Sequence, residues 1–243
     1  MSSNINTISK IDGGRRLRDK TLMDLQSKQL KQIPVMYEKE WHYDFKCNNN
    51  FLRDIYGSPM NRVRGSFLCN NNAIASLQYG PKKVGGDFDC SFNKLKSLEY
   101  GPTTVGRNYI CSNNQISSLI GMPQQINGCF IVSNNDLQTL QYCGDFIGGD
   151  FFATFNFLKN LQYSPTKIGG NFNASNNELV SLEGCPQIIG GNFFINNNSE
   201  LFEDKYFPAF IGANIFARNT KMDKEQILRL IKLNNTHLCG QIF

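Results

Sequence analysis

The 243-residue sequence lacks the long apolar segments that mark membrane and exported proteins. Its longest apolar runs, such as residues 207–211, are far shorter than the roughly 18 residues that a membrane span needs. Residues 1–10 contain no hydrophobic signal segment. We therefore expect a cytoplasmic protein with no membrane contact.

Residues and motifs typical of a catalytic site are also scarce. The only two histidines, His42 and His237, stand in no recognisable motif with Asp, Ser or Cys. The phosphate-binding motif G-x-x-x-x-G-K-[ST] is missing, and the Gly-Gly pairs recur at expected turns, where we interpret them as positive-φ residues. The sequence thus indicates a protein that is not an enzyme and needs no cofactor.

Charged residues make up 19% of the chain, and the positive excess is confined to its ends. Residues 1–42 contain eight Lys and Arg against five Asp and Glu, and residues 202–243 contain six against four. The middle of the chain is balanced, with eleven of each. A nucleic-acid partner is therefore not expected, because such proteins concentrate basic residues on their main surface.

Asparagine, by contrast, is abundant, with 30 residues, and it disfavours helices. Its positions reveal an internal repeat of 21 residues, or 22 at the first spacing, in which each copy begins with an aromatic anchor. The anchors are Phe45, Phe67, Phe88, Tyr109, Phe130, Phe151, Phe172 and Phe193. Five residues after each anchor stands an Asn: Asn50, Asn72, Asn93, Asn114, Asn135, Asn156, Asn177 and Asn198.

Apolar residues complete the repeat. Small or apolar residues follow two positions after the anchor, and Leu or Ile follow at seven and ten. The pattern resembles a leucine-rich repeat, L-x-L-x-x-N-x-L-x-x-L, over residues 43–201. The sequence of each copy is similar to the short leucine-rich repeats of phage and bacterial proteins. The resemblance implies an α/β-class leucine-rich-repeat solenoid with a parallel sheet on its concave face, an extended convex side and few helices.

The Asn row is expected to form a ladder inside the stacked turns. Each side-chain amide can both accept from and donate to backbone groups that lack partners at the bend after the strand. We therefore predict that Asn114→Ala destabilises the fold.

The chain is expected to have three parts, because a solenoid must cover its two ends. Residues 1–42 would form an N-terminal cap with an amphipathic helix over 16–32, and residues 43–201 would hold the eight repeats. Residues 202–243 would form a C-terminal cap with a helix near 223–235, for which Asp223 is the expected N-cap.

Four of the eight cysteines, Cys47, Cys69, Cys90 and Cys111, occupy the position two after the anchor, where other copies have Ala, Val or Ile. Because Ala, Val or Ile can replace Cys at this position, we interpret the four cysteines as small buried side chains and not as a ladder of metal ligands. No histidine lies nearby in the sequence. Reduced thiols also fit the cytosol. We therefore expect no metal site.

A binding face is better supported than a catalytic site. The residues one after the anchor should point to solvent, yet five of these eight are large and apolar. The predicted protein-binding residues, including flanking carboxylates and two Phe residues four after their anchors, are Leu68, Asp87, Asp89, Phe92, Ile110, Ile131, Asp150, Phe152, Phe155 and Phe194. The alternative is that strand propensity alone places Ile and Phe there, and that terminal segments fold back over the concave face.

The sequence thus predicts a non-catalytic module that binds a partner protein through the concave face. The family resemblance suggests a phage or bacterial effector or inhibitor of a host or defence factor, located in the host cytoplasm if phage-encoded. The alternative is a structural or assembly component, such as a virion or scaffold subunit.

Overall fold

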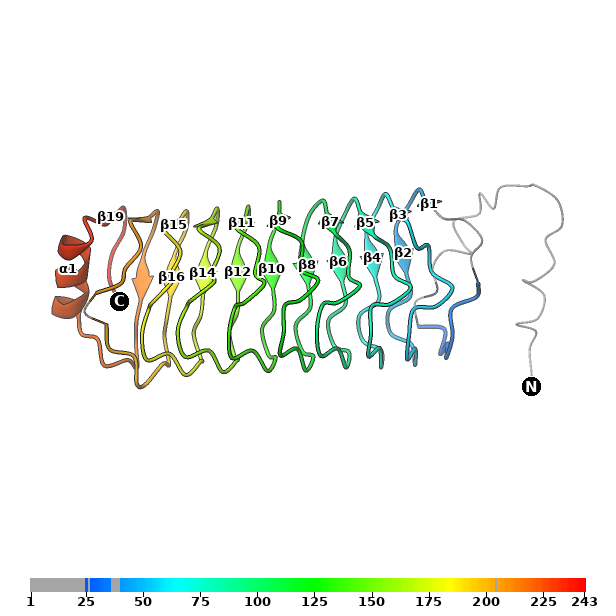
Figure 1. The fold of residues 1–243 in the computed structure, drawn as a ribbon, viewed down its shortest axis with the longest axis horizontal. Helices are drawn as coiled ribbons and strands as arrows, with labels where there is room; N and C mark the ends of the chain where they lie inside the picture. The colour runs from blue at the N-terminus through cyan, green and yellow to red at the C-terminus, as the bar shows by residue number, and fades with distance from the viewer. Residues whose placement is uncertain (1–24, 26, 36–39, 204) are drawn as a thin grey trace.

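The computed structural model describes residues 25, 27–35, 40–203 and 205–243. They form a parallel β-solenoid in which each turn of the chain adds one coil (Figure 1). Figure 1 shows the coils stacked along a nearly straight axis, with the helix α1 (Lys224–Leu233) at the C-terminal end. Among the described residues, no helix is long and apolar enough to span a membrane.

Nine parallel strands of two residues each form sheet A, which crosses the middle of Figure 1. They are β2 (Phe45–Lys46), β4 (Phe67–Leu68), β6 (Phe88–Asp89), β8 (Tyr109–Ile110), β10 (Phe130–Ile131), β12 (Phe151–Phe152), β14 (Phe172–Asn173), β16 (Phe193–Phe194) and β18 (Ile215–Phe216). The first residue of every strand is buried and the second is half-buried, as expected for side chains that alternate between two faces.

A second line of short parallel strands lies along the upper edge of Figure 1 and is divided into two sheets. Sheet B contains β1 (Glu40–Trp41), β3 (Arg62–Val63), β5 (Lys83–Val84) and β7 (Thr104–Val105). Sheet C contains β9 (Gln125–Ile126), β11 (Phe146–Ile147), β13 (Lys167–Ile168), β15 (Ile188–Ile189), β17 (Phe210–Ile211) and β19 (His237–Leu238). Successive strands in both sheets come from adjacent coils.

The coils approach each other closely at the Gly-Gly corner between the two lines of strands. Gly85, Gly106, Gly148 and Gly169 occupy equivalent positions, and a Cβ on any of them would lie 2.1–2.2 Å from a carbonyl oxygen of the preceding coil. Asn127 occupies this position directly after β9, the first strand of sheet C. Arg64 also carries a Cβ at this position, directly after β3, and β3 still pairs with β1. The interpretation of these glycines as positive-φ residues is wrong: the described glycines with positive φ are Gly57, Gly121 and Gly184.

The core is a column of aromatic rings from the anchors, wrapped by Leu, Ile and small residues. Neighbouring anchor rings from Phe45 to Phe193 lie 5.0–5.9 Å apart between centroids. Cys47, Cys69, Cys90 and Cys111 are fully buried free thiols whose pKa is raised by burial. They pack in the core as small apolar side chains do.

Tyr109 is the one anchor with a hydroxyl, and that hydroxyl is buried with no hydrogen-bond partner among the described residues. It lies against Gly101, where a Cβ would be 2.7 Å from the phenol oxygen. The rings on both sides of Tyr109 pack edge-on, at 68° and 89°, whereas the other anchor pairs are stacked at 25° or less.

Replacing Tyr109 by Phe is expected to stabilise the protein by about 1 kcal/mol, because an unpaired buried hydroxyl is costly and the ring remains. Urea unfolding of Tyr109→Phe measures this gain, and Tyr43→Phe at an exposed site is the matched control. A loss of stability in Tyr109→Phe alone would show that the hydroxyl is paired in solution.

The expected N-terminal helix over 16–32 is not found in its described part, and residues 16–24 and 26 lie outside the described residues. Instead, the Leu25 amide donates to the Lys46 carbonyl at 2.9 Å, and the Leu30 amide donates to Asn50 Oδ1 at 3.0 Å. Leu25, Leu30 and Ile33 have the spacing of Cys47, Leu52 and Ile55, so this segment continues the coil pattern. Lys28 stands where a repeat would have its Asn, which hid this relationship.

At the other end the coils also extend beyond the expected boundary at residue 201. Strand β18 adds Ile215 as a further buried anchor, and Ile242 forms a β-bridge with it. The helix α1 follows Asp223, whose carboxylate accepts a hydrogen bond from the Gln226 amide at 2.7 Å. Ile227 and Leu230 of α1 join the core.

Glu203 fixes the connection that precedes this last coil. Its carboxylate accepts hydrogen bonds from the amide of Leu182 at 2.7 Å, the hydroxyl of Ser181 at 2.9 Å, and the amides of Lys205 and Tyr206 at 2.9 and 3.1 Å. Burial opposes the charged form, but these hydrogen bonds together outweigh it and lower the pKa of Glu203.

The lowered pKa predicts a pH dependence of stability. The charged Glu203 stabilises the folded state at pH values above its unfolded pKa, about 4.3, and this contribution is lost as pH falls through the folded pKa. Thermal melts from pH 7 to pH 3 should show Glu203→Gln less stable than wild type at neutral pH, with the difference shrinking as pH falls. A difference that stays constant would contradict this assignment.

Candidate functional site

The sheet A face is the surface formed by the second residues of the sheet A strands. Its in-register order includes Leu68, Asp89, Ile110, Ile131 and Phe152 on five successive strands. The structure therefore brings these predicted residues together in one continuous row. All are half-buried, because each is covered in part by its neighbours along the row.

The row continues towards the C-terminus through the predicted residue Phe194, and then through Phe216 and Phe243, which the sequence analysis did not select. Phe194 lies one strand beyond Asn173, and its ring stacks on Phe216 at 4.6 Å, with 9° between the planes. Phe216 in turn stacks on Phe243 at 5.1 Å. These last two residues were missed because they follow the eighth recognised repeat.

Asp89 lies in the row between Leu68 and Ile110, and the second charged residue of the row, Lys46, is the in-register neighbour of Leu68 on β2. Burial raises the pKa of its carboxyl, and hydrogen bonds from the Ser91 hydroxyl at 2.6 Å and amide at 2.9 Å oppose that rise. The row is thus mostly apolar, with Lys46 and Asp89 near its N-terminal end and Asn173 between Phe152 and Phe194.

Asp87 and Asp150 belong to a different row, which runs one residue before the anchors. Each side chain of this row accepts a hydrogen bond from the backbone amide of its equivalent in the next coil. The successive acceptors are Asp44, Ser66, Asp87, Asn108, Cys129, Asp150, Asn171, Asn192 and Asn214. Asp87 and Asp150 therefore hold the coils together, a role that sequence analysis missed because the residue type varies.

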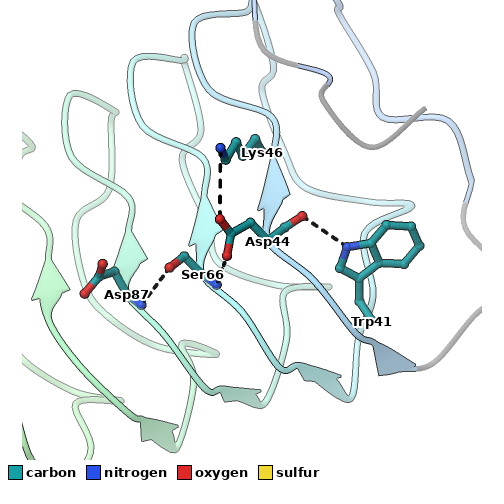
Figure 2. Close-up of polar contacts among 5 residues, drawn as sticks. All are labelled: Trp41, Asp44, Lys46, Ser66 and Asp87. Carbon is teal, nitrogen blue, oxygen red and sulfur yellow. Dashed lines mark hydrogen bonds and ion pairs between the residues drawn. The ribbon is translucent and has the colours of Figure 1, made fainter. Parts of the chain in front are cut away.

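Figure 2 shows the N-terminal end of this side-chain ladder. Asp44 accepts from the Ser66 amide at 2.8 Å, and the Ser66 hydroxyl accepts from the Asp87 amide at 3.1 Å. Lys46 lies 4.0 Å from the Asp44 carboxylate, and the Trp41 indole donates to the Asp44 carbonyl at 3.2 Å. This corner is a structural end of the ladder.

Phe92 and Phe155 lie at the bend that follows sheet A, four residues after their anchors. Every residue described at this position has a positive φ of 52–57°, and the other copies from Asn49 to Asn219 are all Asn. Asn tolerates this left-handed conformation, whereas a bulky aromatic residue does so at a cost. Both Phe side chains are 55% exposed.

The Asn residues at this bend also pair with each other across coils. Asn71 Nδ2 donates to Asn49 Oδ1 at 2.7 Å, and Asn197 donates to Asn176 at 2.9 Å. Phe92 and Phe155 interrupt this outer row, so the chain gives up both the preferred residue and its hydrogen bonds at these two places.

The described residues contain no group of three or more His, Cys, Asp or Glu side chains that could hold a metal ion. Comparisons with known proteins gave no match: no protein-family model fits the chain, and no curated protein or solved structure is detectably similar to it.

Proposed function

We propose that the chain is a non-catalytic protein-binding module of the leucine-rich-repeat type, which holds its partner across the sheet A face and the adjoining bend. The observation that carries this proposal is the placement of Phe92 and Phe155, exposed and in a left-handed backbone conformation. Strained residues persist where the surrounding structure enforces them, and they concentrate at functional sites.

The surface between these two residues has the character of an interface. Phe92 and Phe155 are three coils apart, and the apolar row from Ile110 to Phe152 runs beside them on sheet A. Aromatic residues at the centre of an interface contribute most of its binding free energy, and polar residues surround them. Here the surrounding residues are the Asn side chains of the bend and the Asp89 carboxylate.

The setting proposed is a phage or bacterial effector that inhibits or redirects a host or defence factor, with the ends of the solenoid covered by its terminal segments. This step rests on the resemblance of the repeat alone. The competing function, a virion or scaffold subunit, predicts recovery in fixed stoichiometry with particles.

The double variant Phe92→Asn/Phe155→Asn separates binding from folding. It should be about 1–2 kcal/mol more stable than wild type, because Asn adopts the left-handed conformation more readily and can extend the outer Asn row. Capture of partners from an extract of the organism that encodes the chain should nevertheless be lost, as measured by quantitative mass spectrometry of the bound fraction.

Phe157→Asn is the matched control, because Phe157 is an exposed Phe two residues from Phe155 with an ordinary backbone conformation. It should retain capture. If the double variant binds the same partners as wild type with equal yield, the sheet A face and its bend are not the interface.

A further inference from the structure

A second exposed aromatic row lies away from sheet A, twelve residues after the anchors. Tyr79, Tyr100, Tyr142 and Tyr163 occupy this position with φ of 65–73°, and Gly57, Gly121 and Gly184 occupy it in three other coils, also with positive φ. Glycine adopts this conformation without steric cost, whereas tyrosine does not. The chain therefore retains four tyrosines where glycine would be less strained.

Packing in the core does not explain these tyrosines. Their exposed fractions are 39%, 59%, 51% and 59% in sequence order. Tyr56 extends the row at its N-terminal end, with its ring edge-on to that of Tyr79 at 5.3 Å. With strands about 4.8 Å apart, the row from Tyr79 to Tyr163 spans four coil steps, or about 19 Å.

Exposed Lys side chains stand a few residues before and after the tyrosines of this row in the sequence. Lys96 and Lys159 stand four residues before Tyr100 and Tyr163, and Lys82, Lys83 and Lys167 stand within four residues after Tyr79 and Tyr163. Four residues of chain separate Cα atoms by at most about 14 Å, so each cation lies within that distance of a tyrosine of the row.

Arg53 and Arg62 stand at the equivalent positions of the first coil. Arg62 and Lys83 are in-register partners on β3 and β5, where like charges facing each other are unfavourable. None of the seven cations forms an ion pair with a carboxylate in the described part of the chain. Only Asp54, Glu99 and Asp145 carry negative charge in the same stretches of these coils.

We propose that this tyrosine row binds a single-stranded nucleic acid, with bases stacked on the rings and phosphates beside the lysines and arginines. Aromatic side chains along a positively charged track are the features that bind single strands without sequence preference, and bases of a duplex are not free to stack in this way. An acidic protein could pair with the cations, but this pairing would not account for the strained, exposed tyrosine rings at one position of four coils. The tyrosine row and its seven cations together form a positively charged strip. The balanced charge of residues 43–201 concealed this strip, because the acidic residues that balance its charge, such as Asp87 and Asp150, belong to the side-chain ladder on another side of the coil.

Fluorescence anisotropy of the full chain with a labelled fifteen-nucleotide oligo-dT tests the proposal. About four phosphate contacts predict a slope near −3 of log affinity against log salt, or about fifty-fold weaker binding at 200 mM than at 50 mM salt. Tyr100→Gly and Tyr163→Gly should each weaken binding about ten-fold. Both should fold at least as stably as wild type, because glycine already occupies this position in three coils.

Tyr43→Ala and Lys232→Ala, at exposed sites outside the strip, are the controls and should leave affinity unchanged. Absence of binding at 50 mM salt, or equal affinity in the two glycine variants and wild type, would overturn the proposal. Displacement of oligo-dT by polyglutamate at equal charge concentration would also overturn it, in favour of an acidic protein partner. None of these results depends on the partner held at the sheet A face.

Discussion

Replacing Asn114 by alanine is expected to destabilise the protein by about 3 kcal/mol, because one side chain satisfies four backbone groups. Asn114 Oδ1 accepts from the Leu95 amide at 3.0 Å, and its Nδ2 donates to the carbonyls of Cys90, Cys111 and Ser112 at 3.1–3.2 Å. Alanine leaves these groups unpaired at the bend, and each buried group without a partner costs about 1–3 kcal/mol. The structure around the substituted residue can relax, so the total loss is smaller than the sum of the costs of the four groups. Thermal and urea unfolding measure the loss.

Asn135→Ala should cost at least as much, since Asn135 has the same contacts and is more deeply buried. Gln115→Ala, next to Asn114 but exposed, is the control and should change stability by less than about 0.5 kcal/mol. If Asn114→Ala and Gln115→Ala melted together, the ladder would not contribute to stability.

Gly169→Ala is expected to be similarly harmful, with a loss of about 2–3 kcal/mol. Its new Cβ would lie 2.1 Å from the Gly148 carbonyl oxygen, a backbone atom that can move only if the coils separate. Separation would strain the hydrogen bond from the Gly169 amide to the Ile147 carbonyl, now 2.8 Å, and the pairing of β11 with β13. Overpacking of this kind typically costs about 1–3 kcal/mol.

Asn127→Ala is the control, because Asn127 occupies the corner position equivalent to Gly169. It already carries a Cβ, and it lies where sheets B and C are already separate. The substitution should change stability little. Hydrogen exchange of the sheet C amides would show whether Gly169→Ala opens a second division next to β13. Unchanged stability together with unchanged exchange would show that the close approach at this corner is not needed.

Much of the fold could be predicted because the repeat is local and regular. The aromatic anchors, the Asn row and the apolar residues at fixed offsets all recur every 21 residues, and the structure places them in the core as an asparagine ladder and an aromatic column. The buried cysteines follow from the same exchange with Ala and Val. The sequence also predicts that residues at the same position of each repeat lie side by side, because parallel in-register strands align equivalent positions. This is the arrangement found for Leu68, Asp89, Ile110, Ile131 and Phe152.

The errors arose where a residue acts on the neighbouring coil and not within its own. The segment from Leu25 to Ile33 has apolar spacings of five and three, which fit a helix as well as a coil, and only its hydrogen bonds to the first repeat decide between them. Asp87 and Asp150 looked like charges on an open face, but their acceptors are used by amides 21 residues later. Their variable residue types left no pattern to detect.

The sequence by itself determined the repeat length, the register and the residues that face the core, because side-chain periodicity within one turn depends on local geometry. The tertiary structure alone decided how closely the turns approach. It showed that the corner glycines lie against the backbone of the preceding coil, that Asn127 coincides with the division between sheets B and C, and that Phe92, Phe155 and the tyrosine row carry left-handed backbone strain on exposed side chains. These features depend on the distance between stacked coils and on φ angles, and neither is set by composition or spacing along a single chain.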